Sequence, residues 1–268
     1  MHKENTISLQ IVQRFRWLMI GTILLDMFVT FISQPATYWH HTGSAFESNS
    51  LFYFILTRGF PWNFILYLVY ILAAYLMVSI FPRKLALIAI FSFIFCHFFR
   101  ATCWLSYRWQ FGMTAIFIYA FVVGQMFLHI AFRDAVPPVQ LINKLRWMMV
   151  AAMLFDMTNT ILGQPASWWQ HPATANEGFA LSRFFIMQGL GVFLLYDLVF
   201  FSLLFLLVSS LPKRPALVLV ILLILSYYFG ACTWINNGWH VSAEGPMLYG
   251  IVMSVIFIRL AFPPIDSR

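Results

Sequence analysis

The sequence predicts an all-α integral membrane protein with eight transmembrane helices, built as two tandem, parallel four-helix repeats. Three observations predict this. Hydrophobic residues make up 62% of the 268-residue chain and charged residues only 9%, a composition that needs lipid as its solvent. The chain repeats itself at an offset of 130 positions. Its lysine and arginine residues fall mainly on one predicted side of the membrane.

The two halves of the sequence are most similar in a polar connecting segment. Five of the eight residues in segment 34–41 are identical to those in 164–171, including Gln-Pro-Ala at the start of both. Connecting segments normally vary more than the helices they join. A polar loop that is kept in both halves therefore indicates a shared role.

Each half contains four hydrophobic stretches that are predicted to cross the membrane. They lie at about 17–33, 62–81, 85–102 and 112–132, and at about 147–163, 192–211, 215–232 and 245–262. Four crossings return the chain to its starting side, so the repeats have the same orientation and a pseudo-twofold axis along the membrane normal. The predicted organisation is a cytoplasmic tail (1–13), repeat 1 (14–133), a cytoplasmic linker (134–143), repeat 2 (144–262) and a C-terminal tail (263–268).

The connections differ in length between the two sides. Pro82-Arg83-Lys84 and Pro212-Lys213-Arg214 are tight turns, where proline stops one helix and the basic pair anchors at the head groups. The long connections 34–61 and 164–191 are expected outside. Each ends in an apolar stretch of about ten residues, too short to span and predicted to form an interfacial or re-entrant helix.

The basic residues indicate the orientation. Twelve of the sixteen lie in tails, short turns or helix ends of one predicted side: Lys3, Arg14, Arg16, Arg83, Lys84, Arg133, Lys144, Arg146, Lys213, Arg214, Arg259 and Arg268. This is the positive-inside pattern, so both termini are expected in the cytoplasm, with the protein in a bacterial inner membrane. The net charge of +7 is thereby explained by topology, and no nucleic-acid partner is expected.

A polar stripe runs along the first predicted helix of each half. Asp26, Thr30 and Gln34 are spaced i, i+4, i+8, which stacks them on one face, and Asp156, Thr160 and Gln164 repeat the pattern. Asp26 is expected near the middle of the hydrocarbon layer, where an ionised carboxylate costs several kcal/mol unless it is paired or hydrated. The stripe therefore predicts either a ligand or proton site or a carboxyl that fixes helix packing.

The outer loops add candidate ligands in matching positions: Trp39, His41 and Glu47, and Trp169, His171 and Glu177. Two imidazoles and two carboxylates (His41, His171, Glu47, Glu177) are a donor set for a divalent metal, although the spacing matches no known zinc motif. A metal-free pocket for a polar ligand or a lipid head group, and a purely structural loop, are the alternatives.

The halves also differ in charge. Arg100 and His97 of the first half stand where the second half has Gly230 and Tyr227, and Asp197 stands where the first half has Tyr67. Basic residues on one half and acids on the other suggest ion pairs across the repeat interface, between Arg100 and either Asp197 or Glu244.

Three functions remain open from the sequence. The first is binding or transport of a small polar solute or cation at an outer polar site on the repeat interface. The second is a membrane-embedded enzyme, with or without a metal, acting on a lipid or lipid-linked substrate. The third is a structural partner of another membrane protein, bound through the tryptophan-rich outer loops. No nucleotide-binding, zinc-protease or serine-hydrolase motif is present.

Overall fold

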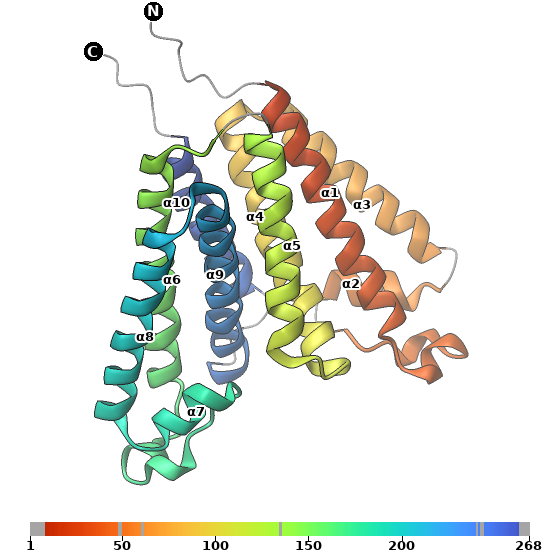
Figure 1. Cartoon of the computed structure of the whole chain (residues 1–268). Coiled ribbons are helices and arrows are strands. Elements are labelled where there is room, and N and C mark those ends of the chain that lie inside the picture. The colour runs from red at the N-terminus through yellow and green to blue at the C-terminus, as the bar shows by residue number, and fades with distance from the viewer. Residues whose placement is uncertain are drawn as a thin grey trace, which may run out of the picture. The chain divides into compact units, whose positions relative to one another are not determined.

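The computed structural model describes residues 9–47, 50–59, 62–133, 136–239, 241 and 244–262. Every regular element in these ranges is a helix. The described chain divides into two compact units: the residues up to Ala115 together with those from Pro246 onward, and Ile116–Gly245 (Figure 1). Most of the predicted N-terminal tail, part of the linker, the C-terminal tail and His240 lie outside the described residues.

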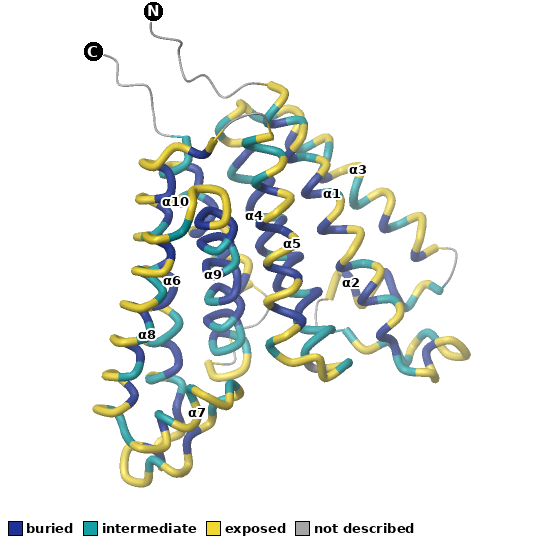
Figure 2. Tube along the Cα trace, viewed as in Figure 1, coloured by how far each residue is buried: buried dark blue, intermediate teal, exposed yellow. Residues whose placement is uncertain are grey.

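The first unit is built around α4 (Arg83–Cys103), which contacts both α1 (Leu9–Ile32) and α3 (Trp62–Ile80). α1 buries one stripe of apolar residues at three- and four-residue spacing: Val12, Phe15, Leu18, Met19, Ile23 and Val29. In Figure 2, α4 is mostly buried, whereas the outer side of α3 is exposed. Polar side chains that α1 carries on the same stripe are consequently enclosed against α4.

Short helices close one end of this unit. Two 3-10 turns, η1 (Ala36–Trp39) and η2 (Thr42–Ser44), lead into α2 (Ser50–Thr57), which packs on α3. One turn of π-helix, η3 (Trp104–Arg108), continues α4. The last long helix, α10 (Glu244–Ala261), joins the unit through Phe257, whose ring lies 4.8 Å from that of Phe91 on α4.

The second unit runs through the same order of elements. It contains α6 (Val139–Leu162), η4 (Ala166–Trp169), η5 (Pro172–Thr174), α7 (Ala180–Ile186), α8 (Leu190–Ser210), α9 (Lys213–Thr233) and the π-turn η6 (Trp234–Gly238). Here α9 is the central helix and contacts α6 and α8.

Most of α5 (Gly112–Phe132) belongs to this second unit. A Cβ on Gly124 would lie 3.2 Å from the Val218 carbonyl oxygen, so glycine permits the close approach of α5 to α9. The compact units therefore do not follow the predicted repeat boundaries, because α5 and α10 each pack mainly with the other half of the sequence.

Seven of the described helices are long and apolar enough to cross a membrane: α1, α3, α4, α5, α8, α9 and α10. The exception among the eight predicted spans is α6, which carries Lys144, Arg146 and Asp156. α3 and α8 are the least buried of the seven, with exposed leucines such as Leu68, Leu72, Leu195 and Leu198. Such outer faces are suited to lipid contact.

Two helices start earlier than the sequence predicts. α1 begins at Leu9 and α6 at Val139, not near 17 and 147, because a helix continues through polar residues as long as its backbone groups are bonded. Arg16 shows how such a residue is accommodated: its guanidinium donates to the Val78 carbonyl oxygen on α3, at 3.2 Å. The short helices predicted in the long connections are confirmed as α2 and α7.

Candidate functional site

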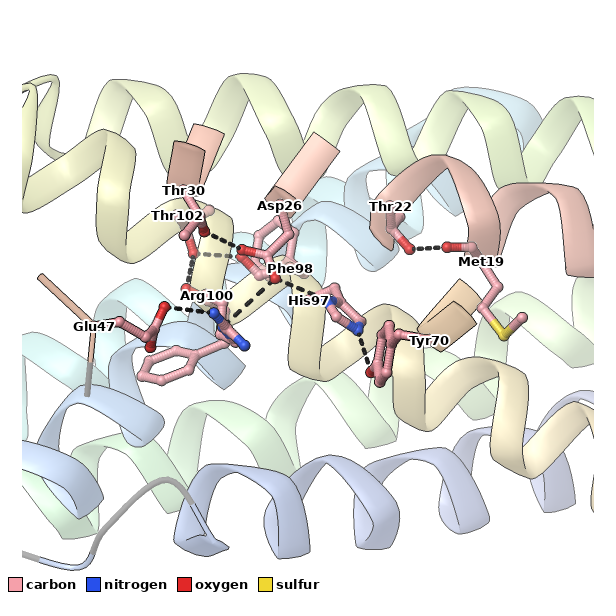
Figure 3. A network of polar contacts seen from close by, with 11 residues as sticks. Met19, Thr22, Asp26, Thr30, Glu47, Tyr70, His97, Phe98, Arg100 and Thr102 are labelled. Atoms are coloured by element: carbon pink, nitrogen blue, oxygen red, sulfur yellow. Dashed lines mark hydrogen bonds and ion pairs between the residues drawn. The ribbon is translucent and has the colours of Figure 1, made fainter. Parts of the chain in front are cut away.

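The polar residues of the first unit meet around Asp26. The helix α1 holds this carboxyl against α4, where it is only 2% exposed. Its Oδ2 lies 2.7 Å from His97 Nδ1 and 3.5 Å from Arg100 Nε, and its Oδ1 accepts from the Thr30 hydroxyl at 3.3 Å. Figure 3 shows Asp26 between the two basic side chains of α4. We call Asp26, Glu47, His97 and Arg100 the first site.

His97 extends the network to α3. Its Nε2 lies 3.0 Å from the hydroxyl of Tyr70. An ionised Asp26 only accepts hydrogen bonds, so Nδ1 of His97 carries the proton toward it. In the neutral imidazole Nε2 then accepts from Tyr70. The three side chains therefore form a continuous hydrogen-bonded chain between α1, α4 and α3.

Arg100 joins Asp26 to the loop carboxylate. Its Nη2 donates to Glu47 Oε2 at 2.8 Å, and its guanidinium carbon lies 3.7 Å from the centre of the Phe52 ring. A flat cation is thus held by two carboxylates and an aromatic face. The sequence suggests partners for Arg100 in the second half, at Asp197 or Glu244. The partners that the structure gives it are instead carboxylates of its own half, because the connection after α1 folds back over α4.

Gln34 and Gln164, which the sequence predicts as ligands, hold the long connecting loops in the structure. Gln34 Nε2 donates to the carbonyl oxygens of Thr30 and Phe46, and its Oε1 accepts from the Phe46 backbone N–H at 2.8 Å. Gln164 makes the same bonds with Thr160 and Asn176. Both side chains are buried, and their hydrogen-bonding groups are occupied in tying the loop to the helix end.

We expect Gln164→Ala to loosen the loop of the second unit. Three hydrogen bonds would be lost and the Asn176 N–H left without its acceptor, at a cost of about 2–4 kcal/mol in the free energy of unfolding. Unfolding by sodium dodecyl sulfate in mild detergent measures this. Gln188→Ala, which changes an exposed glutamine of the same unit, is the matched control. Equal losses in both variants would contradict the role of Gln164.

The aromatic and histidine candidates of the loops lie on the protein surface. Trp39 and Trp169 are 54% and 55% exposed, and His41 and His171 are exposed as well. Among the described residues no group of three or more His, Cys, Asp or Glu side chains lies close enough to hold a metal ion. The divalent-metal hypothesis on His41, His171, Glu47 and Glu177 consequently gains no support from this geometry.

Two groups of residues are missed when site residues are chosen from the sequence. His97 and Tyr70 belong to the network, and the sequence signal for His97 is that it precedes Arg100 by three positions and so shares its helix face.

The second group consists of Tyr38 and Trp168, which are 2% exposed and lie beside the exposed Trp39 and Trp169. The Tyr38 hydroxyl donates to the carbonyl oxygen of residue 56 and Trp168 Nε1 to that of residue 186, each at 3.1 Å. These two side chains anchor the long connecting loops.

The second unit has acidic residues at the positions that correspond to Asp26 and Glu47, but no basic residues at those that correspond to His97 and Arg100. Asp156 on α6, Glu177 in the loop and Asp197 on α8 are close enough for their charges to interact. We call these three residues the second site. Gly230 and Tyr227 occupy the positions that correspond to Arg100 and His97. No ion pair joins Asp156, Glu177 or Asp197 to a basic side chain among the described residues.

The carboxylates of the second site are incompletely satisfied. Asp197 is 6% exposed, and its Oδ2 has no hydrogen-bond partner among the described residues. Oδ1 of Asp156 is also buried without a partner in the described part of the chain, although the residue as a whole is partly exposed. Burial raises the pKa of Glu177, and the backbone N–H groups of Phe179 and Gly178 partly offset this. Buried, unpaired carboxylate oxygens are costly, which favours a function for the second site.

No protein-family model, curated protein or solved structure matches this chain. Function is therefore inferred from the chemistry of the two sites.

Proposed function

We propose that this chain is an eight-span inner-membrane protein that binds a small cation at its outer side for transport. In this arrangement α6 is the eighth span, the two halves are tandem repeats, and both termini are cytoplasmic. The 24 residues of α6 give a length of roughly 36 Å, enough for a hydrocarbon layer of roughly 30 Å. Its basic residues lie near one end, at Lys144 and Arg146, as the positive-inside pattern requires.

The observation that carries the proposal is the charge of the second site. Three carboxylates interact there without a basic partner among the described residues, and two of their buried oxygens have no hydrogen-bond donor. In the first site, by contrast, each carboxylate has a basic neighbour. A bound cation would supply the missing positive charge. The first site then serves to hold its helices together, and the second to bind the ligand.

Cation binding is tested by the thermal stability of the full chain purified in detergent. A ligand present at about 100 times its Kd raises the free energy of unfolding of the protein by about 2.7 kcal/mol. Monocations at millimolar concentration are therefore expected to raise the Tm if their Kd is micromolar. The panel contains sodium, potassium, methylammonium and methylguanidinium chlorides. We expect at least one to stabilise the protein, and uptake of that cation into proteoliposomes tests transport.

Asp156→Asn with Asp197→Asn is the variant that removes the site with little change in side-chain volume. We expect it to abolish the stabilisation by cations. Glu244→Gln, which also removes one acid, is the control and is expected to keep the response. A wild-type protein that responds to none of these cations would contradict the proposed function and leave the outer loops, with exposed Trp39 and Trp169, as a docking surface to examine.

A further inference from the structure

The second site keeps counterparts of both carboxylates of the first site but lacks its arginine. Counting forward by 130 residues, Asp26 becomes Asp156 and Glu47 becomes Glu177, so both carboxylates are kept. Arg100 becomes Gly230. The two carboxylates that pair with the guanidinium in the first unit therefore have counterparts in the second, whereas Phe52 corresponds to Ser182 and position 230 provides no side chain.

The remaining substitutions shift the charge in the same direction. His97, the other basic group of the first site, becomes Tyr227, and Tyr67 becomes Asp197. The second site thus has three acids and no base, where the first has two acids, an arginine and a histidine.

The carboxyl group of Asp156 packs directly against Gly230. A Cβ built on this glycine would lie 2.6 Å from Asp156 Oδ1 and 2.8 Å from Oδ2. The Asp156 carboxyl therefore occupies the space in which a side chain at position 230 would begin, and glycine permits this close approach. The same carboxyl has the unpaired Oδ1, and the second unpaired oxygen, on Asp197, comes from helix α8 of the same unit.

From these correspondences we propose that the ligand of the second site carries a guanidinium group. The proposal rests on the cation-binding function above and names the chemical class of the cation. A guanidinium group is flat, delocalised and weakly hydrated, with N–H donors along several edges, so one group can bridge carboxylates on different helices. Arg100 does this with Asp26 and Glu47 in the first unit.

A single metal ion fits the second site less well. A divalent ion needs its carboxylate ligands gathered at about 2.0–2.6 Å around one point, and no such group of three exists among the described residues. The ring of Tyr227, which packs edge-on with Phe201, lies within electrostatic range of Asp156 and Asp197. Tyrosine rings favour organic cations, as Phe52 does for Arg100.

The test is a titration calorimetry series on the detergent-purified full chain. Methylguanidinium is the probe, methylammonium is the control with equal charge, and urea is the flat control without charge. We expect methylguanidinium to bind at least about tenfold more tightly than methylammonium, urea not to bind, and Asp156→Asn with Asp197→Asn to abolish binding. Methylammonium or sodium binding as tightly as methylguanidinium would overturn this inference and leave the cation-binding function intact. Absence of binding by every cation would overturn both.

Arg100→Ala extends the test to the first site. If the two sites are equivalent, removal of Arg100 opens a second place for the probe, and the stoichiometry for methylguanidinium rises from one to two. Methylguanidinium should also restore part of the Tm lost by this variant, and methylammonium should restore less. A stoichiometry that stays at one, in a variant that remains folded and monodisperse, would overturn the equivalence on which the inference depends.

Discussion

Arg100→Met is expected to lower the free energy of unfolding by about 3–5 kcal/mol, because it leaves two buried carboxylates without their shared cation. Methionine retains most of the apolar part of the arginine side chain. The decrease in the free energy of unfolding therefore reflects mainly the loss of the positive charge. Asp26 is 2% exposed and keeps only His97 as a basic neighbour, whereas the Glu47 side chain, 5% exposed, loses its 2.8 Å contact with the guanidinium. Unfolding by sodium dodecyl sulfate in mild detergent, followed by tryptophan fluorescence, measures the difference.

Arg58→Met is the matched control for this prediction. Arg58 also lies over a phenylalanine ring, 4.1 Å from the centre of Phe54, but it is exposed and forms no ion pair with a described carboxylate. We expect a loss of about 1 kcal/mol or less in the free energy of unfolding.

The triple variant Arg100→Met, Asp26→Asn, Glu47→Gln should recover most of the stability lost in Arg100→Met, because the uncompensated negative charges are then gone. Similar losses for Arg58→Met and Arg100→Met would show that the carboxylates do not depend on Arg100.

Trp168→Ala is expected to cost about 3–5 kcal/mol, the usual range for removing a large aromatic side chain from a core. Trp168 is 2% exposed and packs with Ala175, Ile186 and Phe193 under the long loop of the second unit. Its indole N–H also donates to the Ile186 carbonyl oxygen. The variant therefore loses both the packing of η4 on α7 and the hydrogen bond that fixes their spacing.

The neighbouring tryptophan provides an internal control. Trp169→Ala removes a side chain that is 55% exposed, so we expect a loss below about 1 kcal/mol. Trp168→Phe keeps an aromatic ring but removes the N–H, and it should cost about 1–2 kcal/mol. The Ile186 carbonyl oxygen retains the Gly189 N–H as a donor, which limits this loss.

Tm measurements on the three variants check this ranking. Trp168→Ala should be the least stable, Trp168→Phe should be intermediate, and Trp169→Ala should be the most stable. Equal Tm values for the two alanine variants would contradict the assignment of Trp168 as the anchor of the loop.

The positions of the acids, and the helices that carry them, are predictable from sequence. The spacing of Asp26, Thr30 and Gln34 places them on one helix face, and all three are buried, the first two on α1 and Gln34 just beyond its end. The short apolar stretches in the long connections are predicted as helices because they are bounded by turn residues and are too short to span, and they form α2 and α7.

The partners of these residues are not predictable in the same way. Spacing along one helix says nothing about which other helix faces it, and the decisive contacts join residues far apart in sequence. His97 lies 71 positions from Asp26, and Arg100 lies 53 positions from Glu47. The uneven distribution of opposite charges suggests partners for Arg100 in the second half, but charge composition carries no information on distance.

The sequence by itself determined that this is a helical, membrane-compatible protein whose polar residues recur at an offset of 130 positions, because composition and periodicity are local properties of the chain. Only the tertiary structure decided which of these polar residues are paired with other groups of the chain. Gln34 and Gln164 are used by the loop backbone, and Arg100 neutralises the first site. The carboxylates of the second site are left with oxygens unpaired among the described residues, because pairing depends on which side chains meet across helices.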